Sequence, residues 1–138
     1  MEKRIIIMED DPFLREFYSF IFAKIGYKAD ILEDGDLFFE KLNSAKYNLI
    51  LMDLSLKNTY FKETKVDGVT LSKLVKQNNL FKTIPIVIVT AHSVDYHSKH
   101  LFEESLADEY IIKPISDVHQ FIGKIDFIME KYNNTESE

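Results

Sequence analysis

Four places in the sequence carry the side chains best suited to chemistry. They are the acids at residues 9–11, Asp53, Thr90 and Lys113. Clustered carboxylates repel one another, and their pKa values rise unless a cation lies between them. Mg²⁺ prefers such oxygen ligands and is usually held by one or two carboxylates together with waters. If these side chains meet in the fold, their types predict a magnesium site with a lysine beside it.

The elements that must position these side chains are short apolar runs that alternate with amphipathic stretches. Strands are predicted over residues 4–8, 27–32, 47–52, 84–89 and 109–112. Helices are predicted over residues 13–25, 68–75, 96–106 and 116–132, and another begins at residues 34–35. This alternation predicts a parallel sheet, because right-handed crossovers lay each helix across it. Parallel sheets bind ligands at the carboxyl ends of their strands, which is where the acids, the threonine and the lysine lie.

Composition limits the other possibilities. The 138 residues, 46% hydrophobic and 29% charged, predict one globular domain, which we assign to residues 1–132 with a polar tail at 133–138. The chain has no cysteine, so disulfides and thiolate chemistry are excluded. A net charge of −6 argues against direct binding to nucleic acid. The apolar run at residues 5–8 is too short for a signal peptide or a membrane span, so a cytoplasmic protein is expected.

Five motifs, taken in order, resemble the receiver domain of two-component response regulators. The motifs are IIIMEDDPFLRE, NLILMDLSL, VDGVTL, IPIVIVTA and ADEYIIKPI. The resemblance covers residues 3–131. It implies a doubly wound α/β fold of the flavodoxin-like (βα)5 type, with a five-stranded parallel sheet in the strand order 2-1-3-4-5.

The resemblance also implies roles in phosphoryl transfer. Asp53 would be the phosphoacceptor, and Thr90 and Lys113 would bind the phosphoryl oxygens. Tyr110 matches the switch aromatic of the family, and the bond between Lys113 and Pro114 matches a cis bond. Phosphoryl transfer suits these residue types, because it needs a nucleophile in line and positive charge around the equatorial oxygens.

The same resemblance implies a Mg²⁺ cofactor bound beside the phosphoacceptor, which would be one ligand. Asp10 would bind the ion directly and Glu9 through water, with the backbone carbonyl of Ser55 as a further ligand. Asp10 is preferred to Asp11 as the direct ligand because Arg15 follows Asp10 at the family's usual distance. Asp11 would then cap the first helix.

The resemblance implies a phosphohistidine donor on a sensor histidine kinase or a histidine phosphotransfer protein. The chain would catalyse its own phosphorylation and dephosphorylation without turning over an external substrate. Ser55 and His92 border the path of the attacking water in the family, so both are expected to affect the lifetime of the acyl phosphate. Residues 94–131 would form the surface that changes on phosphorylation and binds a downstream partner or a second copy of the chain.

Two other functions remain open at this point. A Mg²⁺-dependent phosphohydrolase would also use Asp53 as nucleophile, but Ser55 stands where such enzymes need a second acid. A scaffold that is never phosphorylated would not need the complete set of acids, threonine and lysine.

The sequence departs from the family pattern in two segments. Lys57 replaces the usual proline, and the spacer is longer than usual through the segment NTYFKETK. This 57–66 insert is interpreted as a tolerated surface insertion or as a partner-contact or lid element anchored by Tyr60 and Phe61. Leu106 replaces a usual glycine, so the turn there is expected to be altered.

The first helix is rich in aromatic residues. Phe13, Phe17, Phe20 and Ile21 follow a helical spacing and are predicted to form its core face. Tyr18 and Phe22 lie off that stripe and are expected to be partly exposed.

Overall fold

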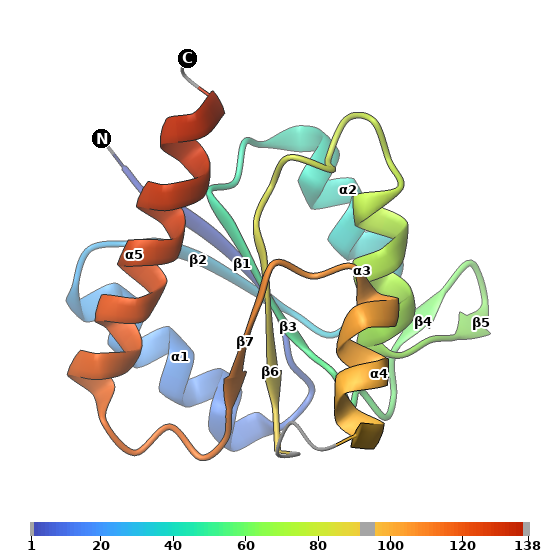
Figure 1. The fold of residues 1–138 in the computed structure, drawn as a ribbon, viewed down its shortest axis with the longest axis horizontal. Helices are drawn as coiled ribbons and strands as arrows, with labels where there is room; N and C mark the ends of the chain where they lie inside the picture. Colours follow the sequence, from blue (N-terminus) through green and yellow to red (C-terminus); the bar gives the residue numbers. More distant parts are fainter. Residues whose placement is uncertain (1, 92–95, 137–138) are drawn as a thin grey trace.

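A five-stranded parallel sheet forms the centre of the fold (Figure 1). The computed structural model describes residues 2–91 and 96–136, and only the backbone for 96–98 and 134–136. The strands are β1 (Arg4–Met8), β2 (Lys28–Leu32), β3 (Leu49–Asp53), β6 (Ile86–Thr90) and β7 (Glu109–Ile112). Their order in the sheet is β2-β1-β3-β6-β7. Counted along the chain this is 2-1-3-4-5, so the predicted fold class and strand order are confirmed.

Helices cover both faces of the sheet (Figure 1). One face is covered by α1 (Pro12–Lys24) and α5 (Val118–Glu136). The other face is covered by α2 (Gly35–Ser44), α3 (Gly68–Lys76) and α4 (Tyr96–Ser105). Among the described residues, no helix combines the length and the apolar character needed to cross a membrane.

The strand residues alternate between two cores, as the two-residue period of a strand requires. On β1, Ile6 and Met8 pack in the core under α2 and α3, while Ile5 and Ile7 pack in the core under α1 and α5. The same alternation continues in β3 and β6, whose residues are all buried. A central strand buried on both faces reads as a continuous apolar run, which is why these strands were recognisable in the sequence.

The last helix extends beyond its predicted end at residue 132 and continues to Glu136. The segment expected to begin a polar tail is therefore helical over residues 133–136. The side-chain amide of Asn133 donates to the backbone carbonyls of Asn48, at 3.2 Å, and Met129, at 2.7 Å. The bond to Asn48 connects the end of α5 to the residue before β3, and the bond to Met129 lies within α5.

The predicted core face of α1 is confirmed for Phe17 and Ile21, which pack in the core under α1 and α5, and is wrong for Phe13 and Phe20. Phe13 is 84% exposed and Phe20 is 67% exposed, whereas Tyr18 and Phe22 are buried. The helix carries apolar residues around almost its whole circumference, so spacing alone did not determine which face packs on the sheet. The buried face includes Ile21, as predicted, and Tyr18 and Phe22 contact Phe121 of α5 with ring centroids 6.2 Å apart in each pair.

The 57–66 insert forms a small antiparallel hairpin that the sequence did not predict. Its strands are β4 (Tyr60–Phe61) and β5 (Thr64–Lys65), and the hairpin projects beside α3 in Figure 1. Lys62 and Glu63 make the turn with φ of 50° and 67°. Strands of two residues each carry too little alternation to be recognised from sequence.

The turn after α4 keeps a left-handed residue although its glycine is missing. Leu106 has φ of 60°, so the expected alteration of this turn is not found in the backbone. Leu106 is also 47% exposed, so its side chain does not compensate for the left-handed strain by burial.

Candidate functional site

Asp53 is the last residue of β3 and lies at the carboxyl edge of the sheet. Its side chain is nearly buried, and its Oδ1 accepts a hydrogen bond from the Ser55 backbone N–H at 3.2 Å. The chain packs closely behind it, because a Cβ on Gly68 would lie 2.0 Å from the backbone oxygen of Asp53. Only glycine fits at that contact, which explains the glycine at the start of α3.

Lys113 reaches the same site from the end of β7. Its backbone N–H donates to the Thr90 carbonyl at 2.7 Å, and its peptide bond to Pro114 is cis, as expected. The Lys113 Nζ lies 3.2 Å from Oε1 of Glu9 and 3.4 Å from Oδ1 of Asp53. One ammonium therefore pairs with two carboxylates from two different strands.

Glu9 is the most deeply buried acid of the site, with 1% of its surface exposed. Burial, and after it the negative charge of Asp53 and a hydrogen bond with it, raise the pKa of Glu9 from 4.5 to about 7. The Lys113 ammonium and the backbone N–H of Asp11, which donates to Oε2 at 3.2 Å, act in the opposite direction. Glu9 therefore carries less negative charge near neutral pH than an isolated carboxylate would.

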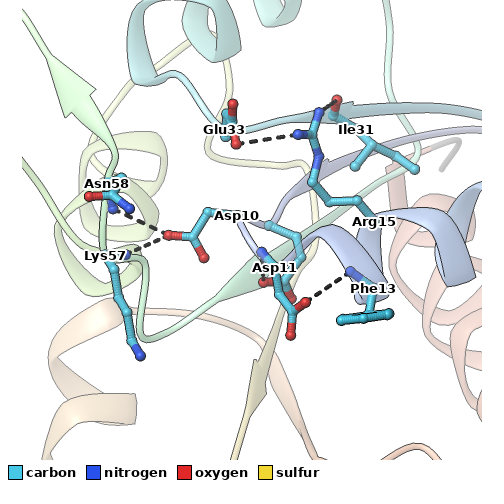
Figure 2. A network of polar contacts seen from close by, with 9 residues as sticks. Asp10, Asp11, Phe13, Arg15, Ile31, Glu33, Lys57 and Asn58 are labelled. Atoms are coloured by element: carbon cyan, nitrogen blue, oxygen red, sulfur yellow. Dashed lines mark hydrogen bonds and ion pairs between the residues drawn. The ribbon is translucent and has the colours of Figure 1, made fainter.

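The two acids that follow Glu9 have separate partners (Figure 2). Asp11 caps α1, because its Oδ1 accepts from the Phe13 N–H at 2.9 Å. Asp10 turns the other way, and its Oδ2 accepts from the backbone N–H groups of Lys57, at 2.7 Å, and Asn58, at 3.2 Å. The structure thus places Asp11 in its predicted capping role.

One carboxylate oxygen from each of Glu9, Asp10 and Asp53 lies within 4.8 Å of the other two. Such a set of oxygens fits the ligand preference of Mg²⁺. The acids open on a cavity of about 380 Å³. Its walls are formed by Glu9, Asp10, Asp11, Asp53, Ser55, Lys57, Asn58, Ala91 and Lys113. The predicted metal-binding residues and Lys113 therefore line one opening, with Ser55 exposed at its rim, whereas Thr90 is not among the residues that line it.

Thr90 and Tyr110 lie on neighbouring strands that connect the site to α4. Thr90 ends β6 and is buried, and Tyr110 is half-buried in β7. The Tyr110 ring packs edge-on against Phe102 of α4, with ring centroids 5.3 Å apart. His92, which was expected to affect acyl-phosphate lifetime, lies outside the described residues.

Sequence reasoning missed two neighbours of the site. The Lys57 and Asn58 amides contact Asp10, a role that could have been inferred from the replacement of a proline, which has no N–H, by Lys57. The second neighbour is Tyr18, whose buried hydroxyl has no hydrogen-bond partner within the described part of the chain. Burial raises the pKa of Tyr18, and the charges of Glu9 and Asp53 add to that rise.

Comparisons with known proteins agree with this arrangement. The family model for the response regulator receiver domain matches residues 5–125. The chain therefore belongs to the response regulator receiver domain family of two-component systems, and the resemblance found in the sequence is confirmed.

The chain is similar to the response regulator ArlR of Staphylococcus saprophyticus, with 33% identity over 128 residues. That match covers 93% of this chain and 53% of ArlR. The phosphate regulon transcriptional regulatory protein PhoB of Escherichia coli is 28% identical over 131 residues, which cover 95% of this chain and 53% of PhoB. The chain thus spans about half the length of these relatives.

Solved structures support the fold. A CheY-like response regulator receiver domain protein from Methanospirillum hungatei superposes with a TM-score of 0.80 at 21% identity, covering 98% of this chain and 99% of that one. The chemotaxis protein CheY4 of Vibrio cholerae superposes with a TM-score of 0.78 at 17% identity, covering 93% and 99%. At these identities the likeness concerns the fold alone.

Proposed function

We propose that this receiver domain accepts a phosphoryl group on Asp53 from a phosphohistidine and thereby changes a partner-binding surface. The observation that carries the proposal is the position of the Asp53 carboxylate. It lies at the end of a buried strand, 3.4 Å from the Lys113 ammonium and beside the carboxylates of Glu9 and Asp10. Membership of the receiver family supports the assignment.

The chemical step is nucleophilic displacement at phosphorus. An Asp53 carboxylate oxygen forms the new P–O bond while the P–N bond to the donor imidazole breaks, and the imidazole nitrogen keeps the electron pair. The product is an acyl phosphate on Asp53. The Lys113 ammonium, already paired with Asp53, neutralises charge on the phosphoryl oxygens.

The acid cluster fits a Mg²⁺ ion in this role. Glu9, Asp10, Asp53 and the backbone carbonyl of Ser55 would hold the ion, either directly or through water. Burial and, after it, the negative charge of Asp53 raise the pKa of Glu9, and a divalent cation would favour the ionised form against both effects. When bound, Mg²⁺ supplies positive charge to the phosphoryl oxygens.

The conformational change that follows phosphorylation of Asp53 would involve Thr90 and Tyr110. New phosphoryl oxygens attract the Thr90 hydroxyl, and the space that it leaves admits the Tyr110 ring, which now packs on Phe102. The surface affected is residues 94–131, of which 96–131 belong to the described part of the chain. A downstream protein or a second copy of the chain would bind there.

The proposed donor is a sensor histidine kinase or a histidine phosphotransfer protein. Direct binding to nucleic acid by this domain is not part of the proposal, because its net charge of −6 disfavours contact with phosphate backbones. PhoB is named a transcriptional regulatory protein, but this chain spans only about half of it. A cytoplasmic location stays a prediction.

Incubation with acetyl phosphate tests the proposal. In the presence of Mg²⁺, the intact mass of the wild-type protein should increase by one phosphoryl group, and addition of EDTA should prevent the increase. The Asp53→Asn variant should not gain the group under the same conditions. If that variant is labelled as fully as the wild type, Asp53 is not the acceptor.

A further inference from the structure

The 57–66 insert contacts the acid cluster through its main chain. Asp10 Oδ2 accepts two hydrogen bonds from this segment, from the Lys57 N–H at 2.7 Å and the Asn58 N–H at 3.2 Å (Figure 2). Lys57 stands where the family pattern has proline, and proline has no N–H to donate. Hydrogen bonds to an ionised carboxylate are among the stronger ones in proteins, so this pair fixes the side chain of Asp10.

The hairpin that follows these amides is docked on α2 by several contacts. A Cβ on Gly35 would lie 2.6 Å from the backbone oxygen of Tyr60 and 2.9 Å from the Cβ of Phe61. The Lys62 N–H donates to both carboxylate oxygens of Asp36 at 3.2 Å. Thr59, at the base of the hairpin, is fully buried. The insert is therefore packed into the domain rather than attached loosely to its surface.

Phe61 completes this docking. Its ring lies 4.8 Å from that of Phe39 on α2, while Tyr60 is 49% exposed. Phe61 thus anchors the hairpin to its own domain. Lys57 and Asn58 also line the acidic cavity, so the beginning of the docked insert forms part of the wall of the site.

We propose that the 57–66 insert is a positioning element for Asp10. Its first two amides hold one carboxylate oxygen, and this fixes the carboxylate at the acid cluster, where it can bind a divalent cation. The inference rests on the proposed function, because it assigns the insert to the cation site of that function. An inert surface insertion is the alternative that the experiments below test against this proposal.

Coupling between the hairpin and the cation follows from this arrangement. If the docked hairpin improves the position of Asp10 for the cation, then the bound cation must stabilise the docked hairpin to the same extent. Undocking the hairpin should weaken cation binding, and adding the cation should slow hydrogen exchange at the hairpin amides. An inert insertion would show neither effect.

The first test uses a matched pair of variants at residue 57. Lys57→Pro removes the N–H that donates to Asp10, whereas Lys57→Ala keeps it and removes only the exposed side chain. Calorimetric titration with Mg²⁺ alone measures the affinity of each protein. Because both variants lose the Lys57 ammonium from the cavity wall, the alanine variant is the reference. Lys57→Pro should bind Mg²⁺ at least about tenfold more weakly than Lys57→Ala, the usual effect of removing a partner of a metal ligand.

A second pair of variants tests the same role without a proline substitution, so the result does not depend on whether Lys57→Pro folds. Gly35→Ala places a methyl group against the Tyr60 backbone and should lift the hairpin from α2, while Gly123→Ala adds a methyl group where nothing lies within 4 Å. Gly35→Ala should reduce Mg²⁺ affinity and speed amide exchange at Asn58 in the metal-free protein. Gly123→Ala should change neither. In the wild type, Mg²⁺ should slow exchange at the Lys62 amide.

The outcomes separate the two proposals. If the wild type does not bind Mg²⁺, the proposed cation site is wrong and the role of the insert fails with it. If the wild type and Gly35→Ala bind Mg²⁺ equally well, and Lys57→Pro binds it as well as Lys57→Ala, the positioning role alone is wrong. The positioning role is also wrong if Asn58 exchanges at the same rate in the wild type and in Gly35→Ala.

Discussion

The buried Glu9 and the partly buried Lys113 form an ion pair that links the ends of the first and last strands of the sequence. The Lys113 Nζ lies 3.2 Å from Oε1 of Glu9, although the two residues are 104 positions apart. The same ammonium lies 3.4 Å from Asp53, so it is shared between two acids. Because one positive charge faces two carboxylates, ionisation of Glu9 should lower the free energy of unfolding of the metal-free domain.

The first prediction concerns pH. The pKa of Glu9 is raised from 4.5 to about 7, so the folded protein holds this proton more tightly than the unfolded chain. The stabilisation is complete below the unfolded pKa and is lost as the pH rises through the folded pKa. Between about pH 4.5 and above pH 7, the free energy of unfolding of the wild type should fall relative to Glu9→Gln by about 3 kcal/mol.

Urea denaturation at several pH values, without divalent cations, measures this difference. Glu16→Gln, which changes an exposed carboxyl on α1, serves as the control and should follow the wild-type curve. Parallel curves for the wild type and Glu9→Gln would show that Glu9 does not titrate in this range.

The second prediction concerns Mg²⁺ affinity. Because the ion competes with the proton on Glu9, binding should strengthen as the pH rises through about 7. From about pH 6 to about pH 8, the association constant should increase about tenfold. Titration calorimetry in two buffers of different ionisation enthalpy should also detect proton release at the lower pH. An affinity that is constant over this range, with no proton released, would contradict the assignment of Glu9 to the cation site.

The third prediction tests which face of α1 packs on the sheet. Phe22 is fully buried, so Phe22→Ala should lower the free energy of unfolding by about 3–5 kcal/mol. Phe20 on the same helix is 67% exposed, so Phe20→Ala should change it by less than about 0.5 kcal/mol. Urea denaturation of the two variants provides the comparison. Equal losses would mean that the helix is rotated relative to the structure.

The fourth prediction concerns the switch. Beryllofluoride with Mg²⁺ mimics the phosphoryl group and should change hydrogen exchange over residues 96–131, beyond the loop after Asp53. Tyr110→Ala should remove much of this distant change while Asp53 is still phosphorylated by acetyl phosphate. Phe127→Ala, at an exposed position on α5, is the control and should respond like the wild type. Exchange that changes only near Asp53 would show that Tyr110 does not transmit the signal.

The strands of the sheet and the edge at which the site lies could be predicted from the sequence. An apolar run buried on both faces is easily recognised, and the residue that follows it must lie at the carboxyl edge of a parallel sheet. For this reason Asp53, Thr90 and Lys113 could be predicted to lie at one edge of the sheet. The capping role of Asp11 followed from the proline after it.

The remaining features depend on tertiary contacts that a local pattern does not contain. On α1, Phe20 and Phe22 are equally apolar, and Phe22 is buried because it packs in the core between the sheet and α5, where it contacts Phe121. The hairpin is stabilised by its contact with Gly35 and by the Phe39 ring, both on another element. The local sequence of the insert therefore gave no sign of its structure.

Chemical mapping of the phosphorylated residue tests the central claim most directly. After incubation with acetyl phosphate and Mg²⁺, borohydride reduces an aspartyl phosphate to homoserine, which peptide mass spectrometry locates in the sequence. The account predicts homoserine at position 53 and at no other aspartate of the chain. Homoserine at Asp10 or Asp11 in place of Asp53, or a labelled protein without homoserine, would contradict it.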